Sequence, residues 1–253
     1  MTVNASTSIA EAKRLGICVI MPTYNNAGTV ADVVDDVLGY CEDVIVVNDG
    51  CTDDTLSRLK GKPVTLIGTE QNHGKGHALR LGFRHARKMG FKRAITIDSD
   101  GQHYASDMPK FIEASSQRPK EIIMGSRNIA TDNMPSQNTF ANRFSNFWFK
   151  VHTGISLPDT QTGYRLYPLD AIYGLGLLTS RYEAELELLV FAAWHGVDIH
   201  PIKVGVYYPP QEQRISHFRP VYDFTRISIL NTILSFASIL YGHPSRIIHK
   251  LLR

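Results

Sequence analysis

The sequence predicts an α/β fold with a mainly parallel central sheet and helices on both of its faces. Short, nearly continuous apolar runs alternate with helix-like segments through the first half of the chain, as buried parallel strands and their crossover helices do. Clusters of turn and polar residues follow these runs, at the edge where such sheets bind ligands. Hydrophobic residues make up 43% of the 253 residues and charged residues 20%, which suits one large domain with a substantial core.

The first half contains five expected strands. The first apolar run, residues 17–21, is followed by Pro22, and Thr29 is suited to cap a helix that extends to about residue 39. The other expected strands cover residues 44–47, 64–67, 93–97 and 121–124. The other expected helices begin near residues 53 and 106 and at the glycine-rich segment 72–76, the last of them extending to about residue 89.

The second half alternates less regularly, and we expect it to form the acceptor side of the same domain. It contains expected helices at residues 139–151 and 181–195, and an edge strand at 199–208 that Pro209 and Pro210 close. Residues 1–15 are expected to be a polar tail without a signal peptide, and residues 16–210 the main domain. Three scattered cysteines favour a reducing compartment, which suggests a cytoplasmic protein.

Residues 211–253 are expected to form a basic flexible segment and an amphipathic helix. They contain six Lys and Arg against two Asp and Glu, whereas the formal net charge of the whole chain is only +3. Such a basic end suits an anionic partner such as a phosphate or a membrane surface, although a solvated basic face explains it equally well. The apolar stretch 227–241 would span only about 22 Å, which is short of a bilayer core. We therefore expect an interfacial helix on an anionic membrane, or else a helix packed on the domain or on a second copy in a homodimer.

Asp98 and Asp100 directly follow an apolar run. Two carboxylates one residue apart at a strand end can chelate a hard divalent ion, and Gln102 can add a neutral oxygen. Such an ion would neutralise a diphosphate leaving group. The alternative is that these residues only form the turn that ends the strand.

Two further clusters suggest a nucleotide. Asp49 ends the second expected strand, where its carboxylate can accept a hydrogen bond from the imino nitrogen of a uracil or guanine, or can cap the next helix. The segment 72–76, which contains Lys75, is similar to a phosphate cradle at a helix N-terminus. Its glycine spacing and the glycine after Lys75 exclude a P-loop, and no dinucleotide-binding glycine pattern follows the first strand.

Six motifs occur in a fixed order and together carry a resemblance. They lie at residues 19–25, 46–53, 72–76, 98–103, 124–127 and 161–167. In this combination the chain, from about residue 17 to residue 208, resembles the family 2 glycosyltransferases, and most closely the polyprenyl- or dolichyl-phosphate mannose synthase branch. The resemblance implies a GT-A nucleotide-sugar-binding fold and an inverting transfer from a nucleoside-diphosphate sugar that depends on Mg²⁺ or Mn²⁺.

The resemblance also implies roles for particular residues. The nucleotide sugar would contact Pro22, Tyr24, Asp49, Lys75, Ser99, Asp100 and Arg214. Asp98, Asp100 and Gln102 would hold the metal, and Arg127 and Arg143 would grip an acceptor phosphate through guanidinium groups. Asn26 and Asn48 stand where the family commonly has acidic residues, so the choice between GDP- and UDP-linked donors stays open.

A phosphate acceptor is already ionised and needs no general base, whereas a hydroxyl acceptor would need a carboxylate to take its proton. Glu185 is the candidate base, and Glu183, spaced four residues from Glu187, is expected on the helix surface. The leading function is transfer of a hexose to a membrane lipid phosphate by a peripheral protein of the inner face, without a nucleic-acid partner. The alternatives are transfer to a lipid or glycan hydroxyl, a sugar-phosphate nucleotidyltransferase, whose first-loop signature is missing here, and a non-catalytic nucleotide-sugar-binding protein.

Overall fold

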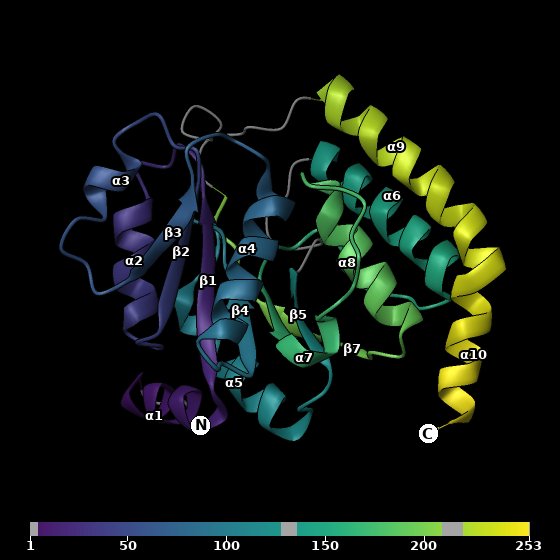
Figure 1. Cartoon of the computed structure of the whole chain (residues 1–253), viewed down its shortest axis with the longest axis horizontal. Helices are drawn as coiled ribbons and strands as arrows, with labels where there is room; N and C mark the ends of the chain where they lie inside the picture. Colours follow the sequence, from purple (N-terminus) through teal and green to yellow (C-terminus); the bar gives the residue numbers. More distant parts are fainter. Residues whose placement is uncertain (1–4, 128–135, 209–219, 253) are drawn as a thin grey trace.

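The computed structural model describes residues 5–127, 136–208 and 220–252, and within them one seven-stranded sheet with helices on both faces (Figure 1). The strands lie in the order β3-β2-β1-β4-β6-β5-β7, and every pairing is parallel except those of β6 with β4 and β5. The prediction of a mainly parallel sheet between helices is therefore confirmed. The strands are β1 (Ile17–Thr23), β2 (Val44–Asp49), β3 (Thr65–Thr69), β4 (Arg93–Thr96), β5 (Ile122–Arg127), β6 (Arg165–Pro168) and β7 (Ile199–Val204).

The helices around the sheet fall close to their expected positions, except α7, which we did not predict. They are α2 (Val30–Leu38), α3 (Thr55–Arg58), α4 (Lys75–Lys88), the 3-10 turn η1 (Ala105–Asp107), α5 (Met108–Gln117), α6 (Ser136–Thr153), α7 (Leu169–Ile172) and α8 (Glu183–Trp194). Alternate residues of β1 contribute to two cores. Ile17, Val19 and Met21 pack with α2 and α5, whereas Cys18 and Ile20 pack with α4 and α8.

Pro22 lies inside β1, although we expected the strand to stop there. β1 continues to Thr23 along β2, but its pairing with β4 ends at Ile20 and Thr96. Ile20 accepts the last backbone hydrogen bond from the β4 side, and Pro22, two residues on, faces the same side. Because β4 no longer pairs with β1 at Pro22, the lack of an N–H on Pro22 costs no backbone hydrogen bond there.

Residues 5–15 form helix α1 (Ala5–Leu15) and not the expected polar tail. Ser8 and Ala12 are buried, and α1 packs against β1 and α5. The polar residues of the segment form the outer face of this helix, and its other face packs on the core.

The C-terminal helix is longer than expected. It consists of α9 (Pro220–Ala237), the π-helical turn η3 (Ser238–Gly242) and α10 (His243–Leu251), which together run along α6 and α8 at the edge of the molecule (Figure 1). The 30 residues Tyr222–Leu251 are long and apolar enough to cross a membrane, so the expectation that this segment is too short is wrong. On the inner side of α9 Leu230, Asn231 and Leu234 are buried, while Ile229, Ile233 and Phe236 are exposed on its outer side.

Candidate active site

The loops after β1, β2 and β4 meet at the carboxyl edge of the sheet, as predicted. The hydroxyl of Ser99 donates to the carbonyl of Pro22 at 3.2 Å and accepts from the side-chain amide of Asn26 at 2.9 Å. Thr29 donates through its hydroxyl to the carbonyl of Ser99 at 2.6 Å. Ser99 is buried, so its hydroxyl links the two loops from inside, while Tyr24 lies half-buried in the first loop.

Asp49 forms hydrogen bonds with the backbone of the glycine-rich segment. The two carboxylate oxygens of Asp49 accept the backbone N–H groups of His73 and Gly74, each at 2.9 Å. The N–H of His77 donates to the carbonyl of Ser180 at 2.9 Å. The N–H groups of His73, Gly74 and His77 are thus engaged by the protein and cannot serve a phosphate, so the phosphate cradle stays a prediction for the rest of the segment.

The glycines of this segment also allow helix α4 to approach the start of α8. A Cβ atom on Gly76 would lie 2.2 Å from the Cβ of Ala184 and 3.0 Å from the carbonyl oxygen of Arg181. Gly74 has φ +99°, and a Cβ atom there would lie 2.6 Å from the Cγ of Arg181. The close packing fixes the first residue of α4, Lys75, between the sheet and α8.

Lys75 joins the two halves of the site. Its ammonium lies 2.7 Å from Oδ1 of Asp98 and 2.8 Å from Oε2 of Glu185, and 18% of its side chain is exposed. Burial opposes its charge, but Asp98 and Glu185 outweigh burial and raise the pKa of Lys75 above its usual value. A Cβ atom on Gly163 would lie 2.7 Å from both Nζ of Lys75 and Oδ2 of Asp98, so a side chain there would displace this ion pair.

Asp100 stands beside Asp98 without a basic partner within ion-pair distance among the described residues. Burial, and then the charge of Asp98, raises the pKa of Asp100 to about 6, so the two carboxylates repel each other. The backbone N–H of Gln102 donates to Oδ1 of Asp100 at 3.0 Å. In the described parts of the chain no three His, Cys, Asp or Glu side chains gather as a metal cluster. Two repelling carboxylates and one amide suit a divalent ion whose other ligands arrive with the substrate.

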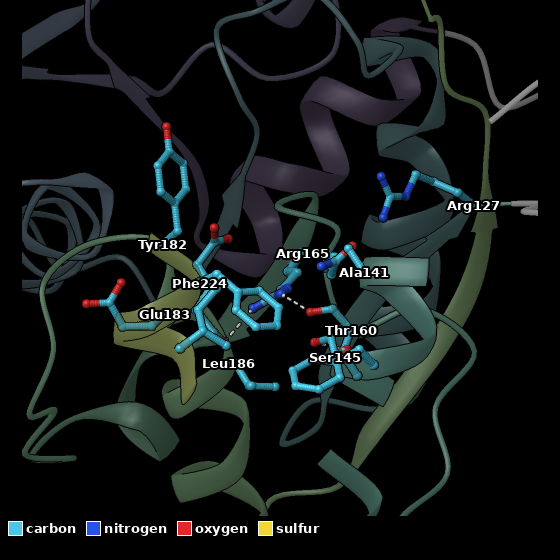
Figure 2. A pocket seen from close by; sticks show the side chains of 13 residues that line it. Arg127, Ala141, Ser145, Thr160, Arg165, Tyr182, Glu183, Leu186 and Phe224 are labelled. Carbon is cyan, nitrogen blue, oxygen red and sulfur yellow. Dashed lines mark hydrogen bonds between the residues drawn. The ribbon is translucent and has the colours of Figure 1, made fainter. Parts of the chain in front are cut away.

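A pocket of about 310 Å³ adjoins this centre on the side of α6, α8 and α9 (Figure 2). Its lining contains charged and polar side chains as well as apolar ones, with Phe144 of α6 and Phe224 of α9 in ring contact at 5.5 Å between centroids. Glu185 lines the pocket and also contacts Lys75, so it connects the two sites. The lining residues are Arg127, Ala141, Phe144, Ser145, Thr160, Gln161, Arg165, Tyr182, Glu183, Glu185, Leu186, Phe224 and Ile227.

Arg165 is a pocket residue that we did not predict. It is fully buried, and its guanidinium donates to the hydroxyl of Tyr167 at 2.9 Å and to the carbonyls of Glu185 and Thr160 at 3.0 Å each. Figure 2 shows it near the centre of the pocket, beside Phe224 and Thr160. Its Nε is buried and has no hydrogen-bond partner among the residues that the structure describes. The motif at 161–167 contained Arg165, but nothing in the sequence indicated that β6 would place it here.

The predicted arginines differ in position. Arg127 lines the pocket, but its fork is bound to the fully buried Asp159, with Nε at 2.6 Å from Oδ2 and Nη2 at 2.9 Å from Oδ1. Arg143 is exposed on α6 and does not line the pocket. Arg214 lies outside the described residues.

The acidic residues at the start of α8 are buried. Glu183 accepts from Arg226 of α9 at 2.6 Å and 2.8 Å, and its side chain is only 1% exposed, so the expectation of a surface residue is wrong. Helix α8 is buried on all sides. The sequence pattern of a helix with one polar face would predict that its acidic residues are exposed. Glu185, the candidate base, is also buried and faces both the pocket and Lys75.

These features define an α/β protein with a candidate site at the carboxyl ends of parallel strands. The chain belongs to glycosyl transferase family 2, whose family model matches residues 18–173. The predicted family is therefore confirmed, and the chain is a glycosyltransferase.

Several curated relatives act on lipid phosphates. A UDP-N-acetylglucosamine–dolichyl-phosphate N-acetylglucosaminyltransferase of Methanococcus voltae is 29% identical over 76% of this chain and 86% of its own length. A dolichyl-phosphate beta-glucosyltransferase of Saccharomyces cerevisiae is 26% identical over 77% of this chain and 68% of its own. An undecaprenyl-phosphate mannosyltransferase of Micrococcus luteus is 26% identical over 64% of this chain and 70% of its own.

The fold recurs in a solved structure. Glucosyl-3-phosphoglycerate synthase of Mycobacterium tuberculosis superposes with a TM-score of 0.64 over 94% of this chain and 84% of that chain, at 20% identity. Another structure of that enzyme contains Mn²⁺, UDP-glucose and phosphoglyceric acid. At this identity the likeness establishes the fold alone.

Proposed function

We propose that this chain is an inverting, metal-dependent glycosyltransferase that moves a sugar from a nucleoside-diphosphate sugar to a membrane lipid phosphate of the polyprenyl type. The observation that carries the proposal is the pocket next to the Asp98–Lys75–Glu185 centre. Its lining combines the guanidinium groups of Arg127 and Arg165 with apolar side chains of α6 and α9. A phosphate group on a hydrocarbon chain has the same division into an anionic head and an apolar tail.

The donor occupies the carboxyl edge of the sheet in this proposal. Pro22, Tyr24 and Asp49 surround the nucleotide, and Asp98 and Asp100, with Gln102, hold Mg²⁺ or Mn²⁺. The ion supplies positive charge to the diphosphate as it leaves. The ammonium of Lys75 adds a second positive charge at the same place, 2.7 Å from Asp98.

The acceptor phosphate lies in the pocket. Arg165 is its main partner, because its Nε is buried without a partner, whereas Asp159 already holds the fork of Arg127. The ionised phosphate oxygen attacks the anomeric carbon as the bond from that carbon to the diphosphate oxygen breaks. One displacement inverts the anomeric centre, forms a sugar–phosphate–lipid diester and releases the nucleoside diphosphate. No proton has to be removed from the acceptor.

The outer face of the C-terminal helix supports a membrane location. Ile229, Ile233, Phe236, Ile239 and Leu240 are 46–82% exposed, and α6 adds Phe140 and Phe147 at 66% and 58%. Exposed basic residues on the same helices, Lys150 and Lys250, suit anionic lipid headgroups. Because the inner side of α9 packs on α6 and α8, we propose that the helix lies on the inner face of the membrane and does not cross it.

One experiment separates the acceptor classes. The purified chain is offered labelled UDP- and GDP-sugars with Mn²⁺ or Mg²⁺ and either a polyprenyl phosphate or a polyprenol. Label in a lipid product that mild acid releases identifies a sugar phosphate and supports the proposal. An acid-stable glycoside formed from the polyprenol would support a hydroxyl acceptor with Glu185 as base, and would refute the phosphate acceptor.

A second experiment tests the membrane face. Co-flotation with vesicles of phosphatidylglycerol and phosphatidylcholine should be strong for the wild type and weak for a Phe236→Glu, Ile239→Glu variant. Leu66→Glu, which changes an apolar side chain 46% exposed on β3 at the far edge of the sheet, is the control and should float as the wild type does. Undiminished flotation of the double variant would argue against this face.

A further inference from the structure

Lys75 occupies a position that neither the donor site nor the acceptor pocket explains alone. Its ammonium contacts Asp98, a proposed metal ligand, at 2.7 Å, and Glu185, a pocket residue, at 2.8 Å. The three side chains are mostly buried, with 18%, 25% and 10% of their surfaces exposed for Lys75, Asp98 and Glu185. One cation therefore serves carboxylates on both sides of the reaction centre.

The ammonium cannot easily leave this place by a movement of its helix. Lys75 is the first residue of α4, and the contact of Gly76 with Ala184 and Arg181 fixes that end of the helix against α8. Gly163 passes over the ion pair, where a Cβ atom would lie 2.7 Å from Nζ of Lys75. A change of partner by Lys75 must therefore be a change in its own flexible side chain.

The charges explain why a change of partner matters. Asp98 and Asp100 are neighbouring carboxylates, and without a ligand Lys75 is the cation that balances Asp98. A divalent ion that binds Asp98 meets the positive charge of Lys75 within a few ångströms, and the two cations repel. A diphosphate brings negative charge that attracts both, so Lys75 and the metal can then stay together.

We propose that Lys75 makes metal binding depend on the nucleoside diphosphate: it neutralises Asp98 in the empty site and transfers its contact to the diphosphate when donor and metal bind together. The same transfer releases the carboxylate of Glu185 toward the acceptor pocket only after the donor is bound. This inference rests on the donor half of the proposed function and is independent of which lipid accepts the sugar.

Linkage predicts the result of a binding measurement. If two ligands favour each other, each raises the affinity of the other by the same factor, and that factor falls when the group that couples them is removed. Mn²⁺ binding to the whole chain is measured by the loss of the electron paramagnetic resonance signal of free Mn²⁺, with and without UDP or GDP. For the wild type we expect weak binding of Mn²⁺ alone and at least tenfold tighter binding with one of the two nucleotides.

Three variants test the role of the charge. Lys75→Gln keeps hydrogen-bond donors but removes the charge, so it should bind Mn²⁺ alone several-fold more tightly than the wild type and show a smaller enhancement by the nucleotide. Lys75→Arg keeps the charge and should keep most of the enhancement. Lys62→Met removes a lysine that pairs with the exposed Asp35 away from this site and should leave both values unchanged.

The outcomes are decisive in either direction. The proposal is wrong if Lys75→Gln, shown to be folded by its thermal transition, binds Mn²⁺ alone no more tightly than the wild type, or keeps the full enhancement. If Lys75→Gln does not fold, the wild type still decides, because an affinity for Mn²⁺ that neither UDP nor GDP changes overturns the proposal. Because no transfer is measured, failure of the lipid-phosphate assay leaves this result unaffected.

Discussion

Replacing Gly76 by alanine adds one methyl group at the contact between α4 and α8. The added carbon would lie 2.2 Å from the Cβ of Ala184, well inside van der Waals contact, and 3.0 Å from a backbone oxygen that cannot rotate away. Alanine favours a helix over glycine by at most about 1 kcal/mol. Overpacking of this kind costs about 1–3 kcal/mol. We therefore expect Gly76→Ala to lower the free energy of unfolding by about 1–2 kcal/mol.

The variant should lose more activity than stability, because the relief of the clash moves Lys75 away from Asp98 and Glu185. Urea unfolding measures the first effect, and sugar transfer under conditions where the variant is fully folded measures the second. Gly176→Ala is the matched control, since a Cβ atom there meets nothing within 4 Å and the backbone is not left-handed.

A second substitution checks the cause. Ala184→Gly removes the atom that the new methyl group meets, so the double variant should be more stable than the sum of the two single changes predicts, by about 1 kcal/mol. Additive changes, or a Gly76→Ala variant as stable as the wild type, would refute the packing argument.

Three other predictions follow from the site and its surroundings. Asp100→Ala should abolish metal-dependent transfer while its thermal transition stays close to that of the wild type, and unchanged activity would exclude a metal role. Arg127→Ala should lower the free energy of unfolding by about 3–5 kcal/mol, because it leaves the buried carboxylate of Asp159 without its ion-pair partner. Arg127→Lys keeps the charge and should raise the KM for the acceptor more than the KM for the donor. Equal increases in the two KM values would count against a phosphate contact. Burial lowers the pKa of His152 from 6.5 to about 4, so between these values the unfolded chain binds a proton that the folded chain does not. Burial of the neutral His152 therefore costs no stability above about pH 6.5, but it lowers the free energy of unfolding by about 2 kcal/mol by pH 5. In urea unfolding, the free energy of unfolding of His152→Gln should decline by about 2 kcal/mol less than that of the wild type between pH 8 and pH 5. An identical decline would refute the assignment.

The strand ends could be predicted from the sequence because their signal is local. Asp98 and Asp100 come directly after a buried apolar run, and parallel strands bring such ends together whatever the rest of the chain does. The glycine-rich segment at 72–76 shows the limit of this reasoning. Its glycines suggest space for a phosphate, but Gly74 and Gly76 also face Arg181 and Ala184, which lie more than a hundred residues further along the chain.

The acceptor side could not be predicted because its contacts are distant in sequence or lie across the sheet. Arg165 is a site residue only because the short antiparallel strand β6 inserts between β4 and β5. Four residues are too few for a periodic pattern to show. Glu183 looked like a surface residue, since its partner Arg226 belongs to a helix that packs on it from 43 residues away. A charged residue that is buried because it forms an ion pair cannot be recognised from the hydrophobic periodicity of the sequence.

The two sides of helix α9 have different roles: one packs on the domain and the other is an exposed apolar face. Its inner side holds the domain: Asn231 is buried, and the backbone carbonyl of Asn231 and the hydroxyl of Ser235 contact Nε2 of His152 at 3.2 Å and 3.3 Å. Leu230 and Leu234 join the hydrophobic core on the same side, whereas Ile229, Ile233 and Phe236 are exposed on the other side. Substitutions on the outer face can therefore change which surface the enzyme prefers while the catalytic core is conserved. In evolution, as in protein engineering, location and chemistry can vary independently on the two sides of this one helix.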